Sequence, residues 1–515
     1  MGKFVASKFK RMKQQFIALI LGFTISITAQ NPEPYVKEID INDLKTKLYS
    51  YASDDFQGRE TGTEGEQLAV NYLRSEYQKL GIRAAKADGD YFQYVPLKVQ
   101  KTPKVSISIG DQSYEYYDDF ISVSSGESTL IKANSYVFVG YGIQDEKYDD
   151  YRSLDVKDKI VVAVSGEPKN EDGNYVISGT KEISKWSNGR QSLSSKRNLA
   201  KDLGAKAFIL VNNSLFKRYS AYYKSRAERG GESNLTLNVK SDPFYGFLVS
   251  DDFGDQLVQN KNGRYDRNIT ITYENNSESI TSENVAAIIP GSTKPDEYII
   301  ISAHLDHVGM HDGEVFNGAD DDGSGTIAML EIAQAFQAAV EQGQGPQRSI
   351  VFLHVTAEEK GLLGSKYYTD YDPIFKLEQT VANLNIDMIG RIDPKRKNGD
   401  RNYVYLIGSD KLSTELHKLS ENVNNKYTNI ELDYTYNDEN DPNRFYYRSD
   451  HYNFAKNNIP IIFYFNGTHA DYHKATDTPD KIEYDLLENR TRLVFHTAWE
   501  LANRKDRIVV DKTFK

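Results

Sequence analysis

Apolar runs and segments with one apolar face alternate through the C-terminal half of the chain. Five apolar runs predict buried strands, at residues 298–303, 349–356, 381–387, 403–407 and 459–465. Apolar residues at helical spacing predict helices between and after them, at residues 323–340, 361–369, 412–423 and 484–502. Apolar strands separated by helices are typical of a sheet that is covered on both faces. We therefore expect an α/β fold, a three-layer α/β/α sandwich with a mixed, mostly parallel central sheet.

The first 275 residues have a different pattern of apolar and polar positions. Residues 40–82 show helical periodicity, and residues 91–130 alternate apolar and polar positions as strands do. Residues 131–275 contain further strand candidates but no cluster of catalytic residue types. Because a single hydrophobic core stops growing at roughly 250–300 residues, a chain of 515 residues should form more than one folded unit. We predict a catalytic domain formed by residues 30–130 and 276–515, interrupted by an inserted β-rich domain at 131–275.

The N-terminus has the pattern of a signal peptide. Lysines and an arginine precede an apolar run at residues 16–27, and Ala29 follows as a small residue before Gln30. The run is short for a transmembrane helix, and no other stretch approaches 18 apolar residues. We expect residues 1–29 to be removed and the mature protein to be exported, periplasmic or secreted, without stable membrane insertion. An uncleaved membrane anchor is the alternative.

Composition narrows the chemistry. The chain has no cysteine, which excludes disulfides, thiolate ligands, a cysteine nucleophile and a lipid-modified N-terminal cysteine. Removal of residues 1–29, which contain no acid, would move the formal charge from −11 to about −16, so nucleic acid is not an expected partner. Any metal site must use imidazole and carboxylate, ligands that suit zinc and related divalent ions.

Ionisable residues follow three of the predicted strands directly. His304 and Asp306 follow the first strand, Glu358 and Glu359 follow the second, and Asp387 ends the third. In sheets of this class, ligands bind beyond the carboxyl ends of the strands. Two adjacent glutamates at a buried strand end repel each other unless positive charge is near. One of them can bind a metal while the other accepts a proton from water, and Asp306 can orient His304.

Three adjacent acids, Asp320, Asp321 and Asp322, stand among glycines just before the helix predicted from residue 323. Acids are favoured at a helix N-terminus, which accounts for one or two of them. Glycines permit unusual backbone angles and a close approach to an ion. One of these acids would suit a position between two cations. His473, in the polar loop at 468–478, is a further candidate ligand, although alone it could be any surface histidine.

These pieces, in this order, resemble the M28 family of zinc peptidases. The matching motifs are Ser302-Ala-His-Leu-Asp306, Gly318-Ala-Asp-Asp-Asp-Gly-Ser-Gly325, Ala357-Glu-Glu-Lys-Gly-Leu-Leu-Gly-Ser365, Leu384-Asn-Ile-Asp-Met388, Arg448-Ser-Asp-His451 and His473-Lys-Ala-Thr-Asp-Thr478. The segment at 54–63 looks like the start of the family's peptidase domain. Residues 131–275 are similar, more loosely, to the protease-associated (PA) domain that is often inserted in these enzymes.

The resemblance implies an aminopeptidase that holds two zinc ions, although other divalent transition metals could occupy the same residues. Asp320 would bridge the two ions, with a cis peptide bond to Asp321. Glu359 and His473 would complete one site, and His304 and Asp387 would complete the other.

The resemblance also implies roles around the metals. Glu358 would be the general base, and Tyr446 would donate a hydrogen bond to the tetrahedral intermediate, although the adjacent Tyr447 competes for that assignment. Asp306, Asp321 and Asp450 would contact the metal ligands and position them without binding the metals themselves. The expected partners are peptide substrates.

Other functions fit the same motifs. A glutaminyl-peptide cyclase uses similar ligands with one zinc, and a carboxypeptidase that prefers acidic C-termini would need a basic pocket, for which Arg391, Arg444 and Arg448 are candidates. A non-catalytic ectodomain of this fold would be expected to lack ligands, and none is missing here. The side-chain preference and the oligomeric state stay open. We assign no ligand role to His307, His311 or His469.

Overall fold

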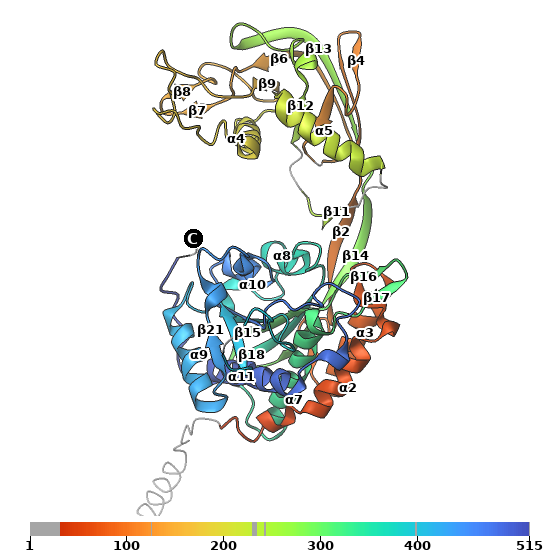
Figure 1. Cartoon of the computed structure of the whole chain (residues 1–515), viewed down its shortest axis with the longest axis vertical. Helices are drawn as coiled ribbons and strands as arrows, with labels where there is room; N and C mark the ends of the chain where they lie inside the picture. Colours follow the sequence, from red (N-terminus) through yellow and green to blue (C-terminus); the bar gives the residue numbers. More distant parts are fainter. Residues whose placement is uncertain (1–30, 125, 229–233, 241–243, 397–398, 514–515) are drawn as a thin grey trace, which may run out of the picture. The chain divides into compact units, whose positions relative to one another are not determined.

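The computed structural model describes residues 31–124, 126–228, 234–240, 244–396 and 399–513. The chain forms two compact units (Figure 1). The first unit comprises the chain up to Val95 and from Ser282 to Lys515, and the second unit comprises Pro96–Thr281. Each unit is described by itself below.

The first unit is built on a mixed sheet. Its strands follow the order β2 (Phe92–Gln100), β14 (Glu278–Ile289), β18 (Arg348–Val355), β15 (Lys294–His304), β19 (Thr380–Ile386), β22 (Ile461–Phe465), β20 (Tyr403–Ile407) and β21 (Glu431–Asp433), and β1 (Arg83–Ala84) pairs with β14. The four central strands β18, β15, β19 and β22 are parallel, whereas β14 and β20 run antiparallel to their neighbours β18 and β22. The predicted mixed sheet is confirmed.

Helices cover both faces of this sheet. Alternate residues of β15 show why: Ile299 and Ile301 belong to one buried cluster, and Ile300 belongs to another. The first cluster includes residues of α2 (Ile41–Tyr51), α3 (Glu64–Lys79), α7 (Gly325–Glu341), α9 (Thr414–Tyr427) and α11 (Tyr484–Asn503). The second includes residues of α8 (Leu363–Asp370) and α10 (His451–Ala455). Each buried isoleucine contributes roughly 1.5–3 kcal/mol, which makes the predicted three-layer sandwich the stable arrangement.

The register of the central strands brings the predicted chemistry to one edge. His304, the last residue of β15, lies opposite Val355 of β18, and Ser302 lies opposite Asn385 of β19. Because these strands are parallel, the residues that follow them leave the sheet at the same edge. The remaining short elements of the first unit are η1 (Val36–Glu38), η2 (Asp54–Arg59), β16 (Gly309–His311), β17 (Glu314–Phe316), η3 (Ala319–Ser324), η4 (Leu377–Gln379), η5 (Thr435–Asn437), η6 (Phe445–Tyr447) and η7 (Pro479–Lys481).

The second unit has its own eight-stranded sheet. Its strand order is β4 (Gln112–Tyr114), β3 (Lys104–Ile109), β13 (Gly263–Glu274), β6 (Thr129–Phe138), β9 (Ile160–Val164), β10 (Ala207–Val211), β12 (Tyr245–Val249) and β5 (Phe120–Ser122). Its other elements are α4 (Gly189–Asp202), α5 (Asn213–Glu228), α6 (Asp251–Gly254), the β7–β8 pair (Gln144–Asp145, Tyr148–Asp149) and β11 (Asn234–Leu237), which pairs with the end of β2. Its likeness to a PA domain stays a prediction.

The boundary of the second unit differs from the one expected at residue 131. Strand β3 pairs with β13, and Ile107 and Ile109 are buried in the core of the second unit. Residues 96–130 therefore belong to the second unit and not to the catalytic domain. Alternating apolar and polar residues fit a strand of either sheet, so the sequence pattern did not distinguish the two.

The predicted signal peptide at 1–29 lies outside the described residues. Within the described ranges, no helix combines the length and the apolar character that crossing a bilayer requires.

Candidate metal centre

His304 lies at the centre of a first group of ligand-type atoms. Its Nε2 is 3.1 Å from Asp321 Oδ1 and 3.7 Å from Asp387 Oδ1, and all three residues are buried. The other ring nitrogen, Nδ1, is 2.9 Å from the backbone carbonyl of Asp306. A metal-ligating histidine is usually held in this way by an acceptor at its second nitrogen.

Asp306 supports the site differently from the prediction. Its carboxylate is 3.8 Å from His304 Nδ1, so the backbone carbonyl and not the carboxylate orients the ring. The carboxylate instead accepts hydrogen bonds from Thr61 Oγ1 at 3.0 Å and from the backbone N–H of Glu358 at 3.1 Å. Asp306 therefore ties the end of β15 to the segment after β18.

A second group shares Asp321 with the first. His473 Nε2 is 3.1 Å from Asp321 Oδ2 and 3.2 Å from Glu359 Oε2. His307 Nδ1 is 3.0 Å from Glu359 Oε1 and 3.9 Å from Asp321 Oδ2. Ligand-type atoms of His304, Asp321 and Asp387, and likewise of His307, Asp321 and Glu359, lie within 4.8 Å of one another. Asp321 is the residue common to both groups.

This geometry corrects the prediction for Asp320. The Asp320 carboxylate points away from both groups and accepts hydrogen bonds from the N–H of Gly390 at 2.7 Å and from Asn466 Nδ2 at 3.1 Å, and it lies 3.2 Å from His469 Nε2. The cis peptide bond joins Asp321 to Asp322 and not Asp320 to Asp321. The three acids sit in an irregular turn whose backbone angles at Asp321 and Asp322 are not helical, so helical spacing did not reveal which carboxylate faces inward.

Unusual backbone conformations aim the site residues. Ala357 precedes Glu358, Met388 follows Asp387, and His473 is itself a candidate ligand. All three have positive φ angles, of 54°, 63° and 54°. Such angles are uncommon for residues other than glycine and concentrate at functional sites. They lie where strand-end loops must turn a carboxylate or an imidazole toward one point.

The electrostatics of the second group call for a cation. Burial would lower the pKa of His473, but hydrogen bonds to Asp321 and Glu359 raise it to about 10. Burial and the charge of Asp321 would raise the pKa of Glu359, but hydrogen bonds from His307 and His473 lower it to about 2. Apart from these imidazole–carboxylate contacts, Asp321 Oδ2, Glu359 Oε1 and both ring nitrogens of His307 are buried without a hydrogen-bond partner among the described residues. Buried carboxylates in such number need compensating positive charge.

The donor set fits a divalent metal. Imidazole and carboxylate are ligands that zinc accepts in catalytic sites. Asp321, Glu359 and His307, which carry these buried atoms, place ligand-type atoms within 4.8 Å of one another. Sequence reasoning left His307 unassigned. Its position in the same loop as His304, three residues on, was the available signal.

Glu358 is separated from Glu359 by its surroundings. Burial raises the pKa of Glu358, and the charges of Glu359, Asp387 and Asp450 raise it further, against the opposing effect of His304. Asp450 is itself fully buried, accepts a hydrogen bond from Ser365, and has its pKa raised by burial to about 7. The two adjacent glutamates thus differ in proton affinity, as an acid–base residue and a ligand should.

A small pocket opens beside these two groups and has a volume of about 30 Å³. Asp321, Glu358, Asp387 and His473 line it on one side. The rest of its lining is apolar or weakly polar apart from one arginine: Met388, Phe445, Arg448, Phe463, Phe465, Thr468 and Tyr472. The pocket therefore combines an acidic floor with aromatic walls.

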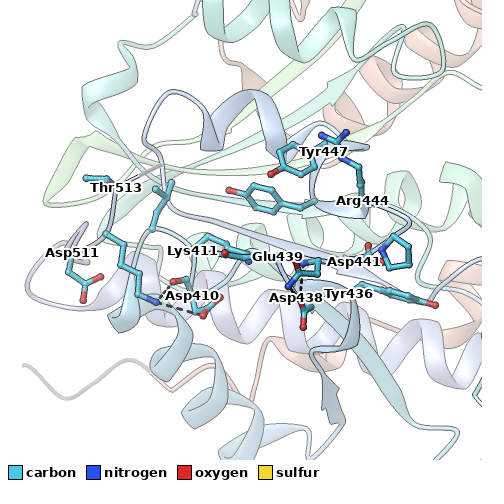
Figure 2. A pocket seen from close by; sticks show the side chains of 15 residues that line it. Asp410, Lys411, Tyr436, Asp438, Glu439, Asp441, Arg444, Tyr447, Asp511 and Thr513 are labelled. Atoms are coloured by element: carbon cyan, nitrogen blue, oxygen red, sulfur yellow. Dashed lines mark hydrogen bonds and ion pairs between the residues drawn. The ribbon is translucent and has the colours of Figure 1, made fainter. Parts of the chain in front are cut away.

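Tyr446 does not line this pocket. It lines a larger neighbouring cavity together with Arg444 and Tyr447, and Figure 2 shows those two side chains there. Its hydroxyl is buried without a hydrogen-bond partner, and burial raises its pKa. The structure therefore does not support the role predicted for Tyr446. The prediction of Tyr446 rests on its spacing from Ser449. Spacing alone does not show which side of the turn at Phe445–Tyr447 the side chains of Tyr446 and Tyr447 face.

Tyr472 lines the pocket beside the ligand groups, and sequence reasoning did not single it out. Its ring stacks on the imidazole of His473 at a centroid distance of 3.9 Å, and its hydroxyl is 3.5 Å from Arg448 Nη2. Burial and the charges of Asp321 and Glu359 raise its pKa, so it remains a hydrogen-bond donor. The signal available in the sequence was its place directly before His473.

Arg59 links the loops that hold the ligands. It is fully buried, and its guanidinium donates to the backbone carbonyls of Leu305 at 3.2 Å, Asn317 at 2.7 Å and Gly318 at 3.0 Å. It also donates to Tyr51 O at 3.2 Å. Arg59 belongs to the segment at 54–63, which thus connects the His304 loop to the Asp321 loop.

Asp322 makes a second link. Its carboxylate accepts hydrogen bonds from the backbone N–H groups of His304 at 3.1 Å, Gly325 at 3.0 Å and Met388 at 3.1 Å. These bonds connect the ends of β15 and β19 to the first residue of α7. The third acid of the cluster is therefore structural.

Known proteins resemble this part of the chain. The model of peptidase family M28 matches residues 284–498. Aminopeptidase NAALADL1 of Mus musculus is 38% identical over 122 residues, which are 23% of this chain and 15% of that protein. Aminopeptidase YwaD of Bacillus subtilis is 28% identical over 298 residues, 52% of this chain and 59% of that protein, so the chain spans less than two thirds of either relative. The solved aminopeptidase from Aneurinibacillus sp. strain AM-1 aligns at 19% identity with a TM-score of 0.46, covering 94% of this chain and 99% of that one.

Proposed function

Since the model of peptidase family M28 matches residues 284–498, we propose that the chain is an exported, zinc-dependent aminopeptidase that removes N-terminal residues from peptides. The observation that carries the proposal is Asp321, which is shared by two groups of imidazoles and carboxylates at the edge of the sheet. The composition of residues 1–29 supports export.

The residues divide into two metal positions. His304 and Asp387 would hold one zinc ion, Glu359 and His473 would hold the other, and Asp321 would bridge them. His307 lies against Glu359 as a neighbouring donor. Bound zinc polarises a carbonyl group and lowers the pKa of coordinated water to about 7.

The protein's own groups handle protons and charge. Glu358 lines the pocket beside the ligands and has a raised pKa, so it can accept a proton from the attacking water and deliver it to the leaving amine. Tyr472 can donate a hydrogen bond to the oxygen of the attacked carbonyl as negative charge develops there. The acidic side of the pocket suits the positively charged amine of a free N-terminus.

The test uses purified enzyme and paired substrates. Leu-Ala-amide and its N-acetylated form are compared, and zinc per chain is measured alongside. The free peptide should be cleaved at least tenfold faster than the blocked one, with about two zinc ions per chain. Equal rates would refute the aminopeptidase assignment, whereas cyclisation of a Gln-leading peptide with one zinc per chain would indicate a glutaminyl cyclase.

The substitution Glu358→Gln tests the role of the base. General bases typically contribute 10²–10⁴-fold, so kcat should fall by about that factor while the zinc content stays at the wild-type level. Glu314→Gln, on the exposed strand β17, is the matched control and should behave as wild type. Unchanged turnover in Glu358→Gln would exclude Glu358 as the base.

A further inference from the structure

The structure separates the three arginines that could make a basic pocket. Arg391 is 2.9 Å from Asp471 and 3.8 Å from Asp477, so its charge is already matched. Arg444 lies over the ring of Tyr447 at 4.8 Å, in the neighbouring cavity (Figure 2). Arg448 alone of the three lines the pocket at the metal centre.

Arg448 has no acidic partner of its own. Its guanidinium lies 4.9 Å from the centre of the Phe445 ring, and its Nη2 is 3.5 Å from the Tyr472 hydroxyl. In the described portion of the chain, no carboxylate oxygen lies within 4.0 Å of it. The side chain is exposed, so the guanidinium keeps donors free to bind a ligand in the pocket.

Arg448 places a guanidinium in the lining of a pocket that is otherwise acidic or apolar to weakly polar, apart from His473. The centre holds four carboxylates that would face the metals: Asp321, Glu358, Glu359 and Asp387. The positive charge of Arg448 stands apart from these carboxylates, because none of the described ones pairs with it, and it stays available to an anionic group of the substrate.

We propose that Arg448 binds a carboxylate of the substrate and makes the enzyme selective for substrates that place one in this pocket. The guanidinium can bind a carboxylate with two parallel hydrogen bonds, while Met388, Phe445 and Phe463 contact the methylene groups that carry it. The carboxylate comes from an acidic side chain next to the cleaved bond or from the C-terminus of a very short peptide. This inference rests on the proposed aminopeptidase activity and names its substrate class.

Two peptide pairs distinguish the sources. Glu-Ala-amide and Gln-Ala-amide differ in the side-chain carboxylate, and Leu-Gly and Leu-Gly-amide differ in the terminal carboxylate. The ratio of kcat/KM within each pair is measured for the zinc-loaded full-length wild type and for Arg448→Gln, Arg448→Lys and Arg444→Gln. Each ratio compares two peptides with the same variant. A substitution that lowers kcat/KM for both peptides by the same factor therefore leaves the ratio unchanged.

The wild type should prefer the carboxylate-bearing member of at least one pair by about tenfold or more, as a charged hydrogen bond contributes roughly 1.5–3 kcal/mol. In Arg448→Gln the ratio should approach one, Arg448→Lys should keep part of it, and Arg444→Gln should keep all of it. Preference in the first pair identifies the side chain as the source, and preference in the second identifies the terminus.

Three outcomes overturn the proposal. The wild type shows no preference in either pair, the preference survives in Arg448→Gln, or Arg448→Gln slows both members of a pair equally, which would mean that Arg448 only positions Tyr472. Failure to cleave any unblocked peptide, Leu-Ala-amide included, would instead overturn the proposed function and this inference with it.

Discussion

Neighbouring acids in this site point in opposite directions. Asp321 lies between the two groups of ligand-type atoms, whereas the Asp320 carboxylate is bound by Gly390, Asn466 and His469. The two adjacent glutamates also differ in their surroundings. Glu359 contacts two histidines, whereas Glu358 lines the pocket. A one-residue shift along the chain therefore changes the task of a carboxylate completely.

Substitutions of the two aspartates should have different consequences. Asp321→Asn removes the shared ligand, so zinc per chain should fall and peptide hydrolysis should drop by at least 10²-fold. Asp320→Asn puts an amide donor against donors of Asn466 and His469, so it should retain zinc but lose about 1–3 kcal/mol of stability. Metal analysis and urea denaturation of both variants make the comparison. Loss of zinc in Asp320→Asn alone would restore Asp320 as the bridge.

Glu66 predicts a pH dependence of stability. It is fully buried in α3 and accepts hydrogen bonds from Ser282, Thr356 and the N–H of Gly62, and burial raises its pKa to about 8. The folded state therefore keeps a proton that the unfolded state loses near pH 4.5. Its contribution to stability is complete below that pH and is lost as pH rises through 8, by about 5 kcal/mol.

Urea denaturation between pH 5 and 8 tests this prediction. Glu66→Gln keeps the shape of the side chain but cannot titrate, so the decline in stability over this range should become shallower. Glu64→Gln, at an exposed position of the same helix, should leave the decline unchanged. Equal slopes in wild type and Glu66→Gln would show that Glu66 does not hold a proton in the folded state.

At the level of elements, the site is a junction of loops held by buried polar groups. Arg59 connects the His304 loop to the loop that carries Asp321, and Asp322 connects the ends of β15 and β19 to α7. Asp477 also accepts hydrogen bonds from the backbone N–H groups of Asp320 and Asp321. These bonds hold the ligand loops in register with the rigid strands.

Arg59→Met should weaken this junction. The apolar side chain fills similar space but leaves the carbonyls of Leu305, Asn317 and Gly318 without their donor, at a cost of about 3–5 kcal/mol. The urea midpoint for loss of peptidase activity should fall, and zinc should dissociate more readily. Arg83→Met, on the exposed side of β1, is the control. A midpoint equal to that of the control would exclude a structural role for Arg59.

The sequence predicts regular elements better than irregular ones. The predicted strand at 403–407 matches β20, and the helix predicted from residue 484 begins there as α11, because buried strands and one-faced helices leave a periodic signal. The turn Ala319–Ser324 and the positive φ of His473 leave none. The motifs located these loops, but they did not show that Asp321 rather than Asp320 joins the two ligand groups, or that Tyr472 rather than Tyr446 lines the pocket beside them.

At the scale of the whole molecule, every residue proposed for the site lies in the first unit. None of the described residues of the second unit belongs to the two ligand groups, and the second unit has a separate core of its own. Stability of the first unit should thus depend on the metal, because the ligand groups gather carboxylates that repel one another without it.

Removal of the metal tests this coupling. Ions that bind only the folded state stabilise it by RT ln(1 + [L]/Kd), so a chelator should lower the melting temperature and abolish hydrolysis, and added zinc should restore both. If the second unit melts as a separate transition, its midpoint should not move. An activity that persists after the chelator has removed all zinc would contradict metal dependence.

The chain passes from the first unit into the second along β2 and returns along β14, and these two strands are neighbours in the sheet. The N–H of Ala286 donates to Tyr91 O, and Asn284 Nδ2 donates to Gln93 Oε1, so β2 and β14 are bonded beside the point where the first unit is interrupted. A pulling force applied to the two ends of the chain would therefore load the contacts within the first unit, both the β2–β14 pair and the packing of α2 on α7 and α11, before it reached the inserted segment. Mechanical unfolding would begin in the first unit, and the second unit would come under tension only after those contacts had parted.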